Sequence, residues 1–222
     1  LAKSITADDV RALKAEHPGV PIVTYVNTSA EVKAESDVCC TSSNALKIVE
    51  ALVAQGHKQI LMTPDKFLAQ NTATQLKAKG VDAEILFWDG ACMVHERFSG
   101  DDVKRLRAQH GDVVVLAHPE CPEDVVTESD FSGSTAQMDT YIKTHQPRKA
   151  ILMTECSMGQ NIAASNPAVE MVGMCQMCPH MKRITLPKIL ASLQTEGPEV
   201  FVDADIAARA RLPIERMLEM SR

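Results

Sequence analysis

The sequence predicts an α/β fold made of short parallel sheets. Short apolar runs rich in β-branched residues alternate with helical patterns along the chain, and two landmarks of the chain occur twice. Such alternation is typical of strand–helix–strand units, in which each helix returns the chain to the next parallel strand. The runs that we interpret as buried strands are residues 21–26, 59–63, 84–87, 112–117 and 150–154.

Two stripes of apolar side chains predict amphipathic helices, because they recur at positions i, i+3, i+4 and i+7. The first stripe is Ala45, Ile48, Val49 and Leu52. The second is Leu186, Ile189, Leu190 and Leu193, and it precedes a helix stop at Gly197-Pro198. We expect each helix to bury its apolar face.

An internal repeat divides most of the chain into two related units. The segment VKAESDVCCTSSNA, which starts at Val32, aligns with VVTESDFSGSTAQ, which starts at Val125, at an offset of 93 residues. The tetrapeptide ILMT occurs at residues 60–63 and again at 151–154. In this alignment the pairs of equivalent positions are Tyr25 and His118, Asn27 and Glu120, Thr41-Ser42 and Ser134-Thr135, and approximately Cys92 and Cys178.

The repeated polar residues follow predicted strands. Ligands of open parallel sheets bind beyond the carboxyl ends of the strands, where loops lead into helices. Ser42 and Thr135 lie near expected helix starts, where free backbone N–H groups favour a carboxylate or a phosphate. This placement predicts an anionic substrate, and the alternative is that both hydroxyls only cap their helices.

The composition of the chain argues against two classes of partner, nucleic acids and membranes. The formal net charge of −6 and the aromatic share of 4% give little basis for binding phosphate backbones or stacked bases. No apolar run approaches the roughly 20 residues of a membrane span. We therefore expect neither a nucleic acid nor a membrane as partner, and the odd number of cysteines, 7, favours a reducing cytoplasm over a disulfide scaffold.

The cysteines are not equivalent in their sequence context. Cys175 and Cys178 form a C-x-x-C pair, a spacing that serves zinc, iron–sulfur clusters and redox disulfides alike. Four others are expected to be small buried apolar residues: Cys39, Cys40, Cys121 and Cys156. Asp65, which follows the first ILMT, is expected to start a helix in contact with solvent.

Six motifs in this order resemble quinolinate synthase, and they cover nearly the whole chain: YVNTSAEVKAESD, TSSNA, WDGACMVHERF, HPECP, GSTAQM and CPHMKRITL. The resemblance implies repeated three-layer αβα domains in a pseudo-threefold arrangement around a central cleft. It also implies a transferase of NAD biosynthesis that condenses iminoaspartate with dihydroxyacetone phosphate to quinolinate, with loss of phosphate and water. The cofactor that it implies is a 4Fe-4S cluster acting as a Lewis acid.

The resemblance assigns two cluster ligands to this chain, Cys92 and Cys178. The third ligand is expected upstream of residue 1, so we interpret the chain as lacking the family's first domain. It then comprises a second repeat over residues 1–95, a third repeat over 96–185, and a helical tail over 186–222 that should pack on the first domain. A disulfide between Cys175 and Cys178 when the cluster is absent is a further expectation.

The resemblance also assigns the substrate pocket. Seven residues are expected to bind substrate: Tyr25, Asn27, Ser42, His118, Glu120, Ser134 and Thr135. Three of these, Tyr25, His118 and Glu120, are expected to act in proton transfer, with Glu120, beside His118, as a general base whose pKa is raised by burial. A functional link to an aspartate-oxidising enzyme, the source of iminoaspartate, is implied as well. The alternatives left open are a non-catalytic fragment that binds a metal or a dicarboxylate, and an aconitase-like dehydratase.

Overall fold

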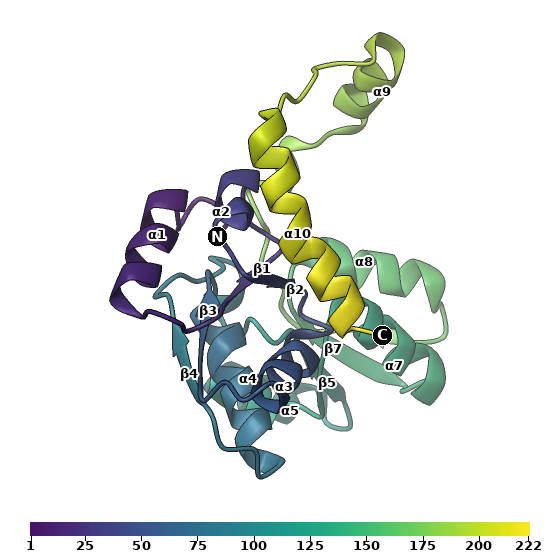
Figure 1. Ribbon diagram of the computed structural model, residues 1–222. Helices are drawn as coiled ribbons and strands as arrows, with labels where there is room; N and C mark the ends of the chain where they lie inside the picture. The colour runs from purple at the N-terminus through teal and green to yellow at the C-terminus, as the bar shows by residue number, and fades with distance from the viewer.

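The computed structural model describes residues 1–222 and confirms the α/β prediction (Figure 1). It contains two four-stranded sheets with all strand pairs parallel, in the orders β2-β1-β3-β4 and β6-β5-β7-β8. The first sheet consists of β1 (Ile22–Tyr25), β2 (Val38–Cys40), β3 (Gln59–Thr63) and β4 (Glu84–Phe87). The second consists of β5 (Val114–Ala117), β6 (Phe131–Ser132), β7 (Lys149–Met153) and β8 (Glu170–Met171). The two sheets have the same strand order, as the internal repeat predicts.

The helices connect and cover these strands. They are α1 (Ala7–Glu16), α2 (Ala30–Ala34), α3 (Ala45–Ala54), α4 (Lys66–Ala78), α5 (Gly100–His110), α6 (Glu123–Glu128), α7 (Thr135–His145), α8 (Cys156–Ser165), α9 (Leu186–Thr195) and α10 (Ala204–Met220), with 3-10 turns η1 (His95–Arg97) and η2 (Met181–Arg183). Capping boxes at Thr6, Ser99 and Ser134 fix the starts of α1, α5 and α7. No helix is both long enough and apolar enough to cross a membrane.

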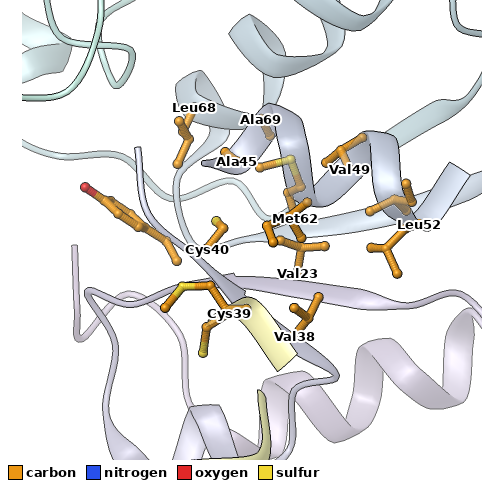
Figure 2. Packing of buried hydrophobic residues seen from close by; sticks show 14 of the residues in the cluster. Val23, Val38, Cys39, Cys40, Ala45, Val49, Leu52, Met62, Leu68 and Ala69 are labelled. Atoms are coloured by element: carbon orange, nitrogen blue, oxygen red, sulfur yellow. The ribbon is translucent and has the colours of Figure 1, made fainter. Parts of the chain in front are cut away.

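Alternate residues of β1 and β3 bury opposite faces of the first sheet, because side chains of a strand alternate in direction. Val23 and Met62 lie in a core formed with α3 and α4, and Figure 2 shows them together with Val49 and Leu52. Ile22 belongs to a second core that includes residues of α1 and α2. The first sheet is therefore the middle layer of an αβα sandwich.

The second sheet repeats this construction. Val115 and Ile151 pack with residues of α5 and α6, whereas Leu116 and Leu152 pack with residues of α7 and α8. Each sheet lies within one of the two ranges predicted as repeats, 1–95 and 96–185. Two sheets alone do not display a threefold arrangement, and the division into domains at these boundaries stays a prediction.

Helix α9 forms as predicted, but the expectation that it buries its apolar face is wrong for this chain. It has no buried residue, and it projects from the body of the molecule in Figure 1. Leu186 and Leu193 are 81% and 75% exposed. The i, i+3, i+4, i+7 spacing sets which side chains share a face of a helix, but it does not supply a surface for that face to contact.

The last helix, α10, returns the chain to the first sheet. It packs on α2 and β2, where Met217 is buried. Asn44 Nδ2 donates to Ser221 Oγ at 2.9 Å, and Arg216 donates to the Asp37 carbonyl at 2.7 Å. Packing of residues 186–222 on a further domain stays a prediction.

Candidate active site

One cavity of about 430 Å³ collects residues from the carboxyl ends of both sheets. It brings together all the predicted site residues except Ser134: Tyr25, Asn27, Ser42, Cys92, His118, Glu120, Thr135 and Cys178. A larger hollow of about 780 Å³ lies at the opposite, amino-terminal end of the first sheet and contains none of them. The shared cavity therefore agrees with the strand-end argument made from the sequence.

The wall from the first sheet carries Tyr25, Asn27 and Ser42. Tyr25 is the last residue of β1 and is buried. Burial raises the pKa of this phenol well above its usual value, and the nearby Glu120 charge raises it further. The phenol is therefore protonated at neutral pH and can donate a hydrogen bond or a proton.

Neither Ser42 nor Thr135 is a helix cap, so the alternative interpretation of these two hydroxyls does not hold. Asn44 occupies the N-cap position of α3, and Thr135 is the first residue inside α7. The cap of α7 is Ser134, whose hydroxyl accepts from the N–H of Gln137 at 3.3 Å and does not line the cavity.

The wall from the second sheet carries His118 and Glu120, in the loop that follows β5. Asn71 of α4 holds this loop, because its Nδ2 donates to the carbonyls of Pro119 and Cys121, both at 2.8 Å. His118 Nδ1 lies 3.1 Å from Glu120 Oε2, and both side chains are 5% exposed. The two groups form one buried acid–base pair.

The sequence argument expected burial to raise the pKa of Glu120, and this expectation is wrong. Burial does act in that direction, but the hydrogen bond from His118 and the charges of His118 and His95 outweigh it, so the pKa of Glu120 is lowered. Glu120 is thus an ionised carboxylate at neutral pH, and its Oε1 atom is buried without a hydrogen-bond partner.

His95 was not predicted as a site residue, although it lies at the centre of this network. Its ring stacks on His118 with 4.6 Å between ring centroids, Nε2 lies 3.0 Å from Thr154 Oγ1, and Nδ1 lies 3.4 Å from Glu120 Oε2. The available sequence signal was its position three residues after Cys92, a C-x-x-H spacing. His95 comes from the turn after the first sheet and contacts residues that follow strands of the second.

The buried state of His95 predicts a pH dependence of folding. Burial, with the charge of His118, lowers the pKa of His95 to about 4. An unfolded histidine takes up a proton near pH 6.5, so the unfolded state binds more protons between these two values. We expect His95 to lower the free energy of unfolding, by about 3 kcal/mol at most, as the pH falls from about 6.5 to 4.

This contribution can be isolated by urea unfolding at several pH values. The difference in stability between the parent and His95→Gln should change across this pH range, because glutamine does not titrate. Exposed His145, which lies outside the cavity, provides the matched control as His145→Gln. If the free energies of unfolding of the parent and His95→Gln changed with pH in parallel, the expectation would be contradicted.

The donor atoms of the cavity suit a metal centre. Cys92, His95 and Glu120 each offer one ligand atom, and these atoms lie within 4.8 Å of one another. Cys92 and Cys178 are free, half-buried thiols that line the same cavity from the two halves of the chain. Burial raises the pKa of Cys92, so a bound cation would stabilise its thiolate. Two free thiols that line one cavity fit an iron–sulfur cluster, which proteins hold through cysteine thiolates.

The remaining cysteines require two corrections. Cys39, Cys40 and Cys121 are buried as predicted. Cys156 is not a buried apolar residue, because it forms a disulfide with Cys175. The expected Cys175–Cys178 disulfide is therefore absent, and Cys178 keeps its thiol. The residues between Cys156 and Cys175 form a helix and a strand that bring these two cysteines together, which sequence proximity could not show.

Asp65 also differs from the expectation, because it starts α4 but is 2% exposed rather than solvated. Burial and the Glu120 charge raise the pKa of Asp65 to about 7, whereas bonds from the N–H groups of Leu68, Cys92 and Phe67 oppose that rise. The adjacent Lys66 pairs with Asp89 at 2.8 Å.

Close packing at Gly90 positions the loop that carries Cys92. A Cβ at Gly90 would overlap the Pro64 carbonyl oxygen and lie 2.7 Å from Ser4 Oγ. We expect Gly90→Ala to lower the free energy of unfolding by about 1–3 kcal/mol, as overpacking usually does. The control is Gly159→Ala inside α8, where nothing lies within 4 Å of the new Cβ, and which should stabilise by about 0.5–1 kcal/mol. Denaturant titrations measure the free energy of unfolding of both variants. Equal values for Gly90→Ala and Gly159→Ala would contradict the close packing at Gly90.

Comparison with known proteins agrees with the resemblance. The family model described as quinolinate synthetase A protein matches residues 1–219. The chain is 54% identical to quinolinate synthase 2 of Mesorhizobium japonicum, over 98% of this chain and 65% of the relative. It is 55% identical to quinolinate synthase of Xylella fastidiosa, over 98% of this chain and 62% of the relative. The chain thus spans less than two thirds of the length of these relatives, and it belongs to the quinolinate synthetase A family.

Proposed function

We propose that this chain provides the catalytic cavity of a quinolinate synthase. In this proposal the enzyme is a cytoplasmic transferase of NAD biosynthesis that condenses iminoaspartate with dihydroxyacetone phosphate and releases quinolinate, phosphate and water. The observation that carries the proposal is the single cavity in which residues from equivalent strand ends of the two sheets meet. An aspartate-oxidising enzyme is the proposed source of iminoaspartate.

Cys92 and Cys178 are the proposed ligands of a 4Fe-4S cluster, with a third cysteine outside this chain. When bound, such a cluster supplies a Lewis acid through the iron that has no cysteine ligand. His95 is neutral at physiological pH and lies three residues from Cys92, so it adds no positive charge beside the thiolates.

The anionic groups of the substrates require donors, and the cavity offers them on both walls. Asn27, Ser42 and Thr135 present amide and hydroxyl groups that can bind carboxylate or phosphate oxygens. Thr135 is the first residue of α7, where free N–H groups and the helix dipole favour an anion. Ser134 contributes by capping this helix start, and we propose that it holds Thr135 in place.

Proton transfer is assigned to three side chains. Glu120 is ionised and buried, so it can remove a proton from a carbon beside a carbonyl group. His118, which lies against Glu120, can pass that proton on. Tyr25 is protonated and faces the same cavity, so it can donate to a developing oxyanion or a leaving hydroxyl.

The test is quinolinate formation by a chain extended to the length of the relatives. After anaerobic reconstitution with iron and sulfide, the protein is supplied with iminoaspartate and dihydroxyacetone phosphate, and quinolinate is measured by chromatography. We expect turnover that requires both substrates and the cluster. A protein that holds its full iron and sulfide but forms no quinolinate would refute the proposal.

A further inference from the structure

Asp65 connects the start of a helix to one of the proposed cluster ligands. Its Oδ1 accepts from the N–H of Leu68 at 2.8 Å, which caps α4. Its Oδ2 accepts from the N–H of Cys92 at 3.1 Å. The carboxylate therefore joins the first turn of α4 to the backbone of Cys92, although 27 residues separate Asp65 from this cysteine.

Glu155 makes the same connection in the second half of the chain. Its Oε2 accepts from the N–H of Ser157 at 2.6 Å, which caps α8. Its Oε1 accepts from the N–H of Cys178 at 3.2 Å. Glu155 is 8% exposed, and Asp65 is 2% exposed.

The two carboxylates occupy related positions in the internal repeat. Asp65 follows the ILMT of β3 after one proline, and Glu155 follows the ILMT of β7 directly. The other acidic cap shows that this bridge is not a general property of acidic N-caps. Asp203 accepts from the N–H groups of Asp205 and Ile206 in α10, and it contacts no cysteine.

We propose that Asp65 and Glu155 are positioning residues that aim Cys92 and Cys178 into the cavity. A hydrogen bond to the N–H of a cysteine fixes the orientation of its peptide plane and hence the direction of its Cα–Cβ bond. The other oxygen anchors that direction to a helix, which is more rigid than the loop. The inference rests on the proposed function, because it takes both cysteines as ligands of the cluster.

The amide variants Asp65→Asn and Glu155→Gln test this role with little damage to the helices. The remaining carbonyl oxygen can still cap the helix, and asparagine is a good N-cap residue. When the carbonyl oxygen keeps the cap, the new NH2 group faces the N–H of the cysteine. Two hydrogen-bond donors then face each other, and the hydrogen bond to the cysteine N–H is lost. Thermal midpoints close to that of the parent are expected, whereas retention of iron should fall.

Two measurements in the chain of full family length give the expected pattern. Transfer of iron from the reconstituted protein to a competing chelator should indicate about 10- to 100-fold weaker retention in each variant, the usual effect of losing a group that orients a metal ligand. In the cluster-free protein, alkylation by iodoacetamide, followed by peptide mass spectrometry, should accelerate several-fold at Cys92 in Asp65→Asn and at Cys178 in Glu155→Gln.

The residue-specific response separates positioning from simple stabilisation. Asp203→Asn alters an acidic cap without a cysteine partner, and it should change neither measurement. The inference would be overturned if Asp65→Asn kept the iron retention and alkylation rates of the parent. Equal acceleration of alkylation at Cys92 and Cys178 in one variant would overturn it as well. Full iron retention in Cys92→Ser would instead refute the ligand assignment of the proposed function, so the two failures are distinguishable.

Discussion

Replacement of Cys92 or Cys178 by serine should abolish iron–sulfur content in a chain of the relatives' length. Each thiol comes from a different half of the chain and reaches the same cavity, so neither can substitute for the other. A serine hydroxyl is a poor iron ligand at neutral pH, because its alkoxide forms far less readily than a thiolate. Iron and sulfide content and the visible absorbance after anaerobic reconstitution measure the effect.

Cys121→Ser is the matched control for these two variants. Cys121 is buried, its thiol donates to the Met153 carbonyl at 3.2 Å, and it does not line the cavity. A serine hydroxyl can make a similar hydrogen bond, so the cluster should assemble in this variant. Normal cluster content in Cys92→Ser would rule out its assignment as a ligand.

Quinolinate formation should fall by about a hundredfold or more in Glu120→Gln, the usual contribution of a positioned general base. Glutamine keeps the size and hydrogen-bonding reach of Glu120 but removes its basicity. Because the hydrogen bond from His118 helps to keep the pKa of Glu120 below its usual value, the carboxylate is ionised at neutral pH and can accept a proton. The rate constant kcat at saturating substrate, normalised to iron content, is the quantity to compare.

Glu123→Gln provides the comparison for this variant, since Glu123 is an exposed carboxylate that binds Thr74 at 2.9 Å outside the cavity. It should retain the parent rate. If Glu120→Gln turned over within a few-fold of the parent, Glu120 would be a binding or structural residue. His118 would then be the better candidate, because the protonated phenol of Tyr25 does not serve as a base.

The spacing of apolar residues predicted which segments form helices. It did not predict whether the apolar face of each helix finds a surface to pack against. The stripe of α3 and that of α9 have the same spacing, yet Ile48 is fully buried and Leu186 is 81% exposed. The strand ends with Tyr25 and His118 were found because the chain direction of parallel strands places them at one edge. The five longest strands and their polar ends were thus accessible from sequence, whereas the two-residue strands β6 and β8 were not predicted.

Contacts between distant segments were not accessible in this way. His95 is recognisable as central only when Glu120 and Thr154 lie beside it, and these come from the second half of the chain. In the sequence, Asp65 is an ordinary polar residue at a helix start. Only the structure shows that the loop with Cys92 covers it. The pKa of Glu120 depended on two histidines, of which the sequence argument considered only one.

Because the two repeats have diverged, the two walls of the cavity carry different chemical groups. Two identical units facing each other would present the same groups from both walls, and an unsymmetrical substrate could then bind in two opposite orientations. Here a phenol stands on one wall where the equivalent strand end of the other carries an imidazole, and an amide corresponds to a carboxylate. The two walls of the cavity therefore differ, and an unsymmetrical substrate would meet different groups in its two opposite orientations.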